Sequence, residues 1–123
     1  MILVDTSIWI DHLRAGNERL STLLAAGQVL SHPFVVGELA LGNLVHRTAV
    51  VEAMQDLPQS RRATEAEVLH ATITRHWYGL GIGYTDAHLL AAVLLTPGSS
   101  LWTRDKRLHA AASRLGVAGS MSR

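Results

Sequence analysis

Ile2-Leu3-Val4-Asp5, near the N-terminus, is the stretch that decides the expected fold. Three consecutive apolar residues without alternation are typical of a strand buried on both faces, as in a parallel sheet covered by helices. The sequence then predicts a helix from Ser7 toward Arg14. Asp5 therefore stands at the carboxyl end of a strand, which is the edge where open parallel sheets bind ligands.

The rest of the chain continues this alternation of short apolar runs and helical stretches. Short strands are expected at 28–30 and 101–103, with a brief edge strand at 61–63 and a last short strand at 117–118. Further helices are expected at 18–26, 33–41, 47–57, 64–77, 86–95 and 106–115, the fifth of them capped by Thr85. This order predicts an α/β fold of three layers, α/β/α, with a mainly parallel central sheet.

Four acidic residues occupy the places where such a fold brings strand ends and helix starts together: Asp5, Glu38, Asp86 and Asp105. Two carboxylates about 4 Å apart repel by roughly 4 kcal/mol at an effective dielectric near 20, so a cluster needs protons or a bridging cation. Oxygen ligands without cysteine favour magnesium or manganese over zinc. A magnesium ion held by carboxylates and substrate phosphate suits phosphodiester hydrolysis.

Each acid also has a structural interpretation. Asp86 and Asp105 could serve as helix caps or interact with the helix dipole, and Glu38 could be a solvated helix residue. The apolar neighbours of Glu38 leave little polar face on its helix, however, so this Glu is expected to need a partner or a metal. The combined pattern of acids favours the functional interpretation.

Hydroxyl residues accompany the acids, and we expect them to orient carboxylates or metal-bound water. They are Thr6, Ser7 and Thr103. Ligands of this kind are usually held by a surrounding set of hydrogen bonds. Each hydroxyl residue is also a common cap or turn residue, which is its structural alternative.

Four segments carry these residues in order: 4–10, 36–39, 84–92 and 101–108. Together they resemble the motifs of PIN-domain ribonucleases, and specifically of VapC-type toxins. In that family the first motif has a metal-binding Asp supported by the next Thr or Ser, and the second has a helix-borne Glu. The third is the most specific, and in the fourth a hydroxyl residue precedes the last acid by two positions. The resemblance covers nearly the whole chain, with no departure at an acidic position.

This resemblance implies a magnesium-dependent endoribonuclease, with manganese as a possible substitute. Asp5, Asp86 and Asp105 would hold one or two metal ions, and Glu38 would complete the acidic shell and orient or deprotonate the attacking water. The family further implies a toxin held inactive by a cognate VapB-like antitoxin, and usually a homodimer. Apolar residues that could serve these partners, although core burial is the stronger expectation for most, are Ile8, Trp9, Phe34, Val35 and Leu39.

Composition agrees with this prediction. A chain of 123 residues with 48% hydrophobic content can form one domain with a substantial core, and residues 1–123 are expected to be a single PIN-like domain. The absence of cysteine excludes disulfides and thiolate metal sites. The longest apolar stretch, 89–95, is too short to span a bilayer, so a cytoplasmic protein without membrane contact is expected.

The net charge is only +1, so overall charge does not indicate a nucleic-acid binder. Local charge is more informative, because Arg104, Lys106 and Arg107 flank the last acid and could contact phosphates at its rim. Arg61 and Arg62 form another small basic cluster. Ordinary solvated charge is an equally good interpretation of both clusters.

Other sites and functions are less well supported. The seven histidines include no HExxH pair and favour packing or surface roles, with His88 expected in or near the core. The glycines of 79–83 miss the dinucleotide fingerprint and indicate a loop or hinge. The tryptophans, in a chain poor in aromatics, are expected to pack in the core rather than stack on bases.

Two alternative functions differ in what they require of the acids. A haloacid-dehalogenase-type phosphatase needs a second Asp at position 7, where this chain has Ser7. A non-catalytic RNA- or protein-binding module on a PIN scaffold would be indicated by loss of acids, and all four are present.

Overall fold

The computed structural model describes residues 1–119. Its centre is a parallel three-stranded sheet of order β2-β1-β3, with strands β1 (Ile2–Val4), β2 (Val29–Leu30) and β3 (Ser100–Trp102). Leu3 of β1 pairs in register with Leu30 on one side and Leu101 on the other. The short apolar runs of the sequence therefore form the strands, and the first run occupies the central position.

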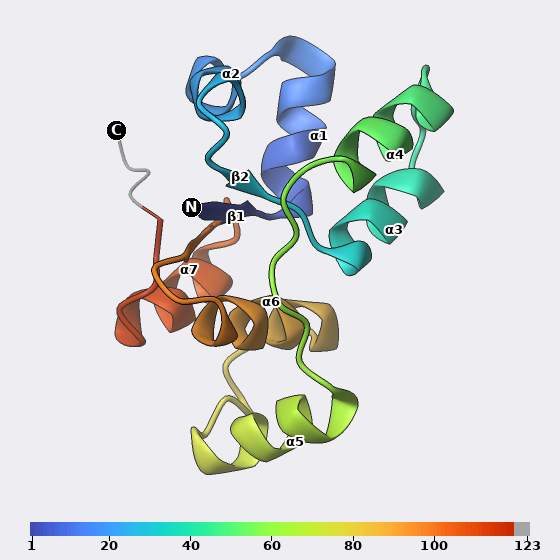
Figure 1. The fold of residues 1–123 in the computed structure, drawn as a ribbon. Coiled ribbons are helices and arrows are strands. Elements are labelled where there is room, and N and C mark those ends of the chain that lie inside the picture. Colours follow the sequence, from blue (N-terminus) through green and yellow to red (C-terminus); the bar gives the residue numbers. More distant parts are fainter. Residues whose placement is uncertain (120–123) are drawn as a thin grey trace.

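Seven helices surround the sheet in the described part of the chain: α1 (Thr6–Ala15), α2 (Glu18–Ala25), α3 (Pro33–Leu41), α4 (Arg47–Gln55), α5 (Glu65–Thr74), α6 (Tyr84–Leu95) and α7 (Lys106–Arg114). Helices α1 and α2 lie on one side of the sheet, and α6 and α7 lie on the other (Figure 1). The predicted three-layer α/β/α fold with a parallel sheet is confirmed. No helix within residues 1–119 is long and apolar enough to cross a membrane.

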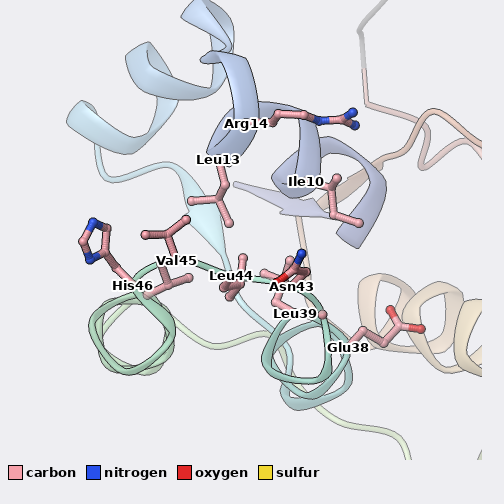
Figure 2. Close-up of a pocket in the computed structure, with 11 residues that line it drawn as sticks. Ile10, Leu13, Arg14, Glu38, Leu39, Asn43, Leu44, Val45 and His46 are labelled. Carbon is pink, nitrogen blue, oxygen red and sulfur yellow. The ribbon is translucent and has the colours of Figure 1, made fainter.

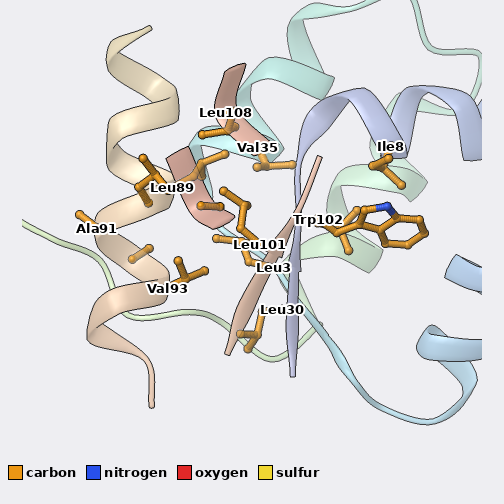
Figure 3. Close-up of a cluster of buried hydrophobic side chains, with 14 of the residues drawn as sticks. Leu3, Ile8, Leu30, Val35, Leu89, Ala91, Val93, Leu101, Trp102 and Leu108 are labelled. Carbon is orange, nitrogen blue, oxygen red and sulfur yellow. The ribbon is translucent and has the colours of Figure 1, made fainter. Parts of the chain in front are cut away.

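The core fills the space between these layers. Leu3 and Leu101 in the strands are fully buried, between Ile8 of α1 and Leu89 of α6 (Figure 3). Burying a side chain of this size stabilises a fold by about 1.5–3 kcal/mol, so strands with apolar residues on both faces require helices on both faces. The tryptophans are also buried, as expected: Trp9, Trp77 and Trp102.

The helices around the third motif begin and end differently from the prediction. Helix α6 begins at Tyr84 after Gly83, whereas the sequence predicted a start at Asp86 capped by Thr85. Asp86 lies inside the first turn, where its carboxylate accepts a hydrogen bond from the Gly83 N–H at 3.0 Å. Helix α5 ends at Thr74, earlier than predicted, and is followed by His76 in the left-handed region at φ 57°.

The predicted edge strand at 61–63 was wrong. A single parallel bridge between Ser31 and Gln59 lies next to β2 instead, because the Arg61 N–H bonds to the Thr96 hydroxyl rather than to a strand. The expected last strand at 117–118 is present only as a parallel bridge between Leu101 and Ala118. The other helices begin and end within two residues of the predicted positions.

Candidate active site

Asp5 is the most firmly held acid at the carboxyl edge of the sheet. It is 7% exposed and caps α1, with Oδ1 accepting from the Thr6 N–H at 2.8 Å. Its Oδ2 accepts from the Ser7 hydroxyl at 3.0 Å and from the Thr103 hydroxyl at 2.7 Å. Charge-assisted bonds of this kind are stronger than neutral ones, so the carboxylate is held in one orientation.

The same hydroxyls join the two ends of the chain. The Thr103 hydroxyl accepts from the Asp105 N–H at 3.0 Å, and the Ser7 hydroxyl accepts from the Arg104 N–H at 3.2 Å. Asp105 then caps α7, with Oδ1 accepting from the N–H groups of Arg107 and Leu108 at 2.9 and 3.1 Å. The loop after β3 is thereby tied to the start of α1.

Glu38 projects from α3 and accepts a hydrogen bond from the Thr6 hydroxyl. The Thr6 side chain therefore holds Glu38, and only its backbone N–H serves Asp5. Glu38 is exposed, as is its neighbour Gly37, whereas Val35 and Leu39 face the core. Glu38 is the polar residue of α3, and the expectation that it needs a partner agrees with its hydrogen bond from Thr6.

Asp86 shows that the acids are close to one another. Burial raises the pKa of the Asp86 carboxyl, the hydrogen bond from Gly83 opposes this rise, and the negative charges of Asp5, Asp105 and Glu38 raise the pKa further. These charges lie near enough to affect Asp86, and hydrogen bonds place Asp5, Glu38 and Asp105 around the starts of α1 and α7. We call Asp5, Glu38, Asp86 and Asp105 the acidic cluster.

The acidic cluster can be compared with the needs of a metal ion. Within residues 1–119, no three Asp, Glu or His side chains are arranged to hold an ion directly. Magnesium, however, keeps several waters and is usually bound by only one or two carboxylates. Because the cluster offers oxygen donors only, and its mutual repulsion would be relieved by a cation, it fits a largely hydrated magnesium ion.

The basic residues around Asp105 have different environments. The guanidinium of Arg104 forms an ion pair with Asp11 of α1, and is therefore engaged inside the chain. Arg107 forms no ion pair within residues 1–119, and its side chain lies directly over the backbone of Gly81. Lys106 is exposed at the start of α7. All three side chains are exposed, and Arg104 differs from Lys106 and Arg107 in having an ion pair with Asp11.

A pocket of about 520 Å³ lies between α1, α3 and the segment that joins α3 to α4 (Figure 2). Glu38 lies at one end of the pocket, and Ile10, Leu13 and Val45 contribute exposed apolar side chains. These were not among the residues expected to form an apolar partner surface. Of that expected set only Phe34 is exposed, and the other four are in the core: Ile8, Trp9, Val35 and Leu39.

The sequence carried a signal for this pocket. Ile10 and Leu13 lie on a different face of α1 from Ile8 and Trp9, so α1 has more apolar positions than one buried face can use. An extra apolar face on a surface helix indicates either a partner or a second packing contact.

The chain matches the model of the PIN domain over residues 2–114, a range that includes the whole acidic cluster. The chain belongs to the PIN-domain family. Two relatives, each named Ribonuclease VapC32, come from Mycobacterium tuberculosis strains CDC 1551 / Oshkosh and ATCC 25618 / H37Rv. Each is 48% identical over 118 residues, which is 96% of this chain and 95% of the relative. Their names confirm the resemblance of this PIN domain to VapC-type proteins.

Proposed function

We propose that this PIN domain is a magnesium-dependent endoribonuclease that hydrolyses RNA phosphodiester bonds. The observation that carries the proposal is the hydrogen-bond network at the carboxyl edge of the sheet, in which Thr6 links Glu38 to the start of α1 and Thr103 links Asp5 to the start of α7. The raised pKa of Asp86, to which Asp5, Asp105 and Glu38 contribute, supports a place for Asp86 near them. The ribonuclease names of two relatives that cover 96% of the chain support the same activity. We further propose that residues 1–123 form a single nuclease domain that works in the cytoplasm.

In this proposal Asp5, Asp86 and Asp105 hold the magnesium ion, or manganese in its place. The bound ion supplies Lewis-acid stabilisation of the phosphate and lowers the pKa of a bound water. Ser7 and Thr103 keep the Asp5 carboxylate in the orientation seen in the structure. Those contacts are made before substrate arrives, so little reorganisation is needed during the reaction.

Glu38 has a separate role in the proposal. It is exposed, and its carboxylate is held through the Thr6 hydroxyl. It therefore orients the attacking water and accepts its proton as a general base. Lys106 and Arg107 contact the phosphates on either side of the cleaved bond, because both lie at the start of α7 beside Asp105.

The direct test is cleavage of a mixed cellular RNA pool by the purified protein in magnesium or manganese. Fragments should disappear in EDTA and in the Asp5→Asn variant, and mapping their ends identifies the cleaved sequence. An absence of cleavage by metal-loaded protein free of any antitoxin would refute the nuclease proposal. It would favour a non-catalytic binding module on a PIN scaffold, in line with the absence of a three-residue metal group in residues 1–119.

We also propose that the protein is the toxin of a toxin–antitoxin pair and acts as a homodimer. The VapC names of the relatives support the assignment as a toxin. The apolar pocket that ends at Glu38 supports binding of a VapB-like antitoxin segment, which would reach the acidic cluster from that side (Figure 2). Co-expression with the cognate antitoxin should abolish cleavage, and a Val45→Glu variant should weaken this inhibition.

A further inference from the structure

The exposed aromatic rings are not the tryptophans but Phe34, Tyr78 and Tyr84, which are 38%, 60% and 59% exposed. Two of these, Phe34 and Tyr84, pack against the same side chain, His88 of α6. Their ring centroids both lie 4.6 Å from that of His88, with Tyr84 edge-on and Phe34 tilted. Two partly exposed rings from different helices are thus held on one support.

The side chain of His88, against which both rings pack, is buried. It is only 3% exposed, and it lies one helical turn after Tyr84 on the same face of α6. Phe34 is further fixed by an edge contact with the buried His32, at 5.2 Å between centroids. These contacts restrict the rings before a ligand binds, which lowers the entropy cost of ordering them on binding.

The rings lie beside the acidic cluster. Phe34 is one helical turn before Glu38 on the same face of α3, a spacing that places their Cβ atoms about 5–6 Å apart. Tyr84, in the first turn of α6, is placed near Phe34 by their shared contact with His88. The acids repel phosphates unless a cation is bound, whereas neutral rings can accept the face of a base.

We propose that Phe34 and Tyr84 form a base-stacking subsite, which holds an unpaired base of single-stranded RNA next to the phosphate at the acidic cluster. This inference rests on the proposed function and adds to it a binding site for a base, formed by named side chains. Bases inside a duplex have no free face, whereas unpaired bases stack on aromatic side chains in most proteins that bind single strands. Tyr78 is equally exposed, but its aromatic contact is with His76 rather than His88, and it is not part of the proposed subsite.

The test compares Tyr84→Leu and Phe34→Leu with the aromatic variant Tyr84→Phe and with Tyr78→Leu, a matched control of equal exposure. Fluorescence anisotropy measures binding of a short labelled oligouridylate and of an abasic oligomer of the same length. Calcium replaces magnesium in both titrations, so that a cation offsets the charge of the acidic cluster, and gel electrophoresis verifies that each oligomer stays intact. Each Leu variant in the subsite should weaken oligouridylate binding by roughly 5-fold or more, as stacking on one base predicts. Tyr84→Phe and Tyr78→Leu should bind like the wild type, and the abasic oligomer should not distinguish the variants.

Equal losses in Tyr78→Leu, or equal losses with the abasic oligomer, would overturn the subsite, as would absence of oligouridylate binding by the wild type. Sedimentation gives a further check, because a changed oligomeric state with unchanged RNA binding would assign the rings to a protein interface. Thermal unfolding verifies that each variant is folded. If Phe34→Leu is unstable, Tyr84→Leu still tests the subsite, because Tyr84 is the more exposed of the two residues. Ring-dependent binding without cleavage would refute only the nuclease, and cleavage without ring dependence would refute only the subsite.

Discussion

At the scale of single residues, the pKa of Asp86 depends on the charges of the other acids in the acidic cluster. Asp86 is only half-buried, yet burial together with three nearby carboxylates raises the pKa of its carboxyl. A group with a raised pKa destabilises the folded state once it is ionised, because folding must bring its charge into an unfavourable site. The cluster is therefore strained near neutral pH when it holds no cation.

Asp86→Asn should consequently raise the melting temperature of the metal-free protein, because it removes one charge from the cluster. Magnesium should stabilise the wild type by mass action, by about 2.7 kcal/mol at a concentration 100 times the dissociation constant. The variant should show a much smaller response to magnesium. Thermal unfolding with and without the metal measures both effects, and an equal metal response in the two proteins would contradict the assignment of Asp86.

The absence of a side chain at Gly81 leaves room for the side chain of Arg107. A Cβ atom at this position would lie 2.6 Å from Cδ of Arg107, and Gly81 has a φ of 78°. Gly81→Ala should displace the Arg107 side chain and lower RNA binding, whereas Gly79→Ala introduces similar backbone strain at φ 72° with no neighbour within 4 Å. Titration of both variants with oligouridylate compares them, and equal losses would show that backbone strain alone is responsible.

At the scale of elements, helix starts determine where the candidate site residues lie. Asp5 caps α1, Asp105 caps α7 and Asp86 closes the first turn of α6, so three of the four acids lie at helix N-termini. The positive end of a helix stabilises a carboxylate placed there, which partly offsets the repulsion inside the cluster. Helix α3 differs, because its N-cap is the buried His32, whose Nδ1 accepts from the Phe34 N–H at 3.0 Å.

The cap of α3 predicts a dependence of stability on pH. Burial, followed by the positive charges of His88 and Arg62, lowers the pKa of His32 from 6.5 to about 4. The folded state therefore favours the neutral imidazole, and stability should be complete above about pH 6.5 and fall as the pH drops toward 4. The loss from this residue is at most about 3.5 kcal/mol, because its pKa falls by about 2.5 and one pKa unit corresponds to about 1.4 kcal/mol.

His32→Asn tests this dependence, because Asn keeps an acceptor for the cap but does not titrate. The smaller side chain should lower stability at neutral pH, yet the difference between about pH 7 and about pH 5 should shrink. Urea unfolding at the two pH values measures that difference. An unchanged difference would assign the acid sensitivity to other groups, such as His88, whose pKa is also lowered by burial.

At the scale of the whole molecule, the site depends on contacts between the two ends of the chain. The bond from Thr103 to Asp5 spans 98 positions in sequence, and the Asp5 N–H bonds to the Trp102 carbonyl at 2.9 Å. Both contacts exist only because β1 and β3 are neighbours in the sheet. Assembly of the acidic cluster is therefore coupled to completion of the fold.

Thr103→Val should weaken both the acidic cluster and the fold. It removes the donor to Asp5 and leaves the Asp105 N–H without its acceptor. An unpaired buried group costs about 1–3 kcal/mol, so the free energy of unfolding should fall by that amount, and RNA cleavage should fall with it. Thr103→Ser keeps the hydroxyl and should restore most of both. A loss in Thr103→Ser as large as that in Thr103→Val would contradict this assignment, because only Thr103→Val removes the hydroxyl.

The sequence by itself determined most of the elements, because the signals for elements are local. The apolar runs at β1 and β3, the Pro at the start of α3 and the Asp that caps α7 each act within a few residues. Where the prediction was wrong, a distant partner intervened. Residues 61–63 lost their expected strand because the Arg61 N–H found the side chain of Thr96, 35 positions away.

The sequence also marked the four acids as candidates and, through its motifs, the PIN-domain family. Only the tertiary structure decided how they are held: that Thr6 serves Glu38, that Ser7 and Thr103 serve Asp5, and that Arg104 is engaged by Asp11. The tertiary structure likewise brought Phe34 and Tyr84 together on His88. Residue type and spacing encode local conformation, whereas the pairing of side chains from different elements follows from packing around a shared core.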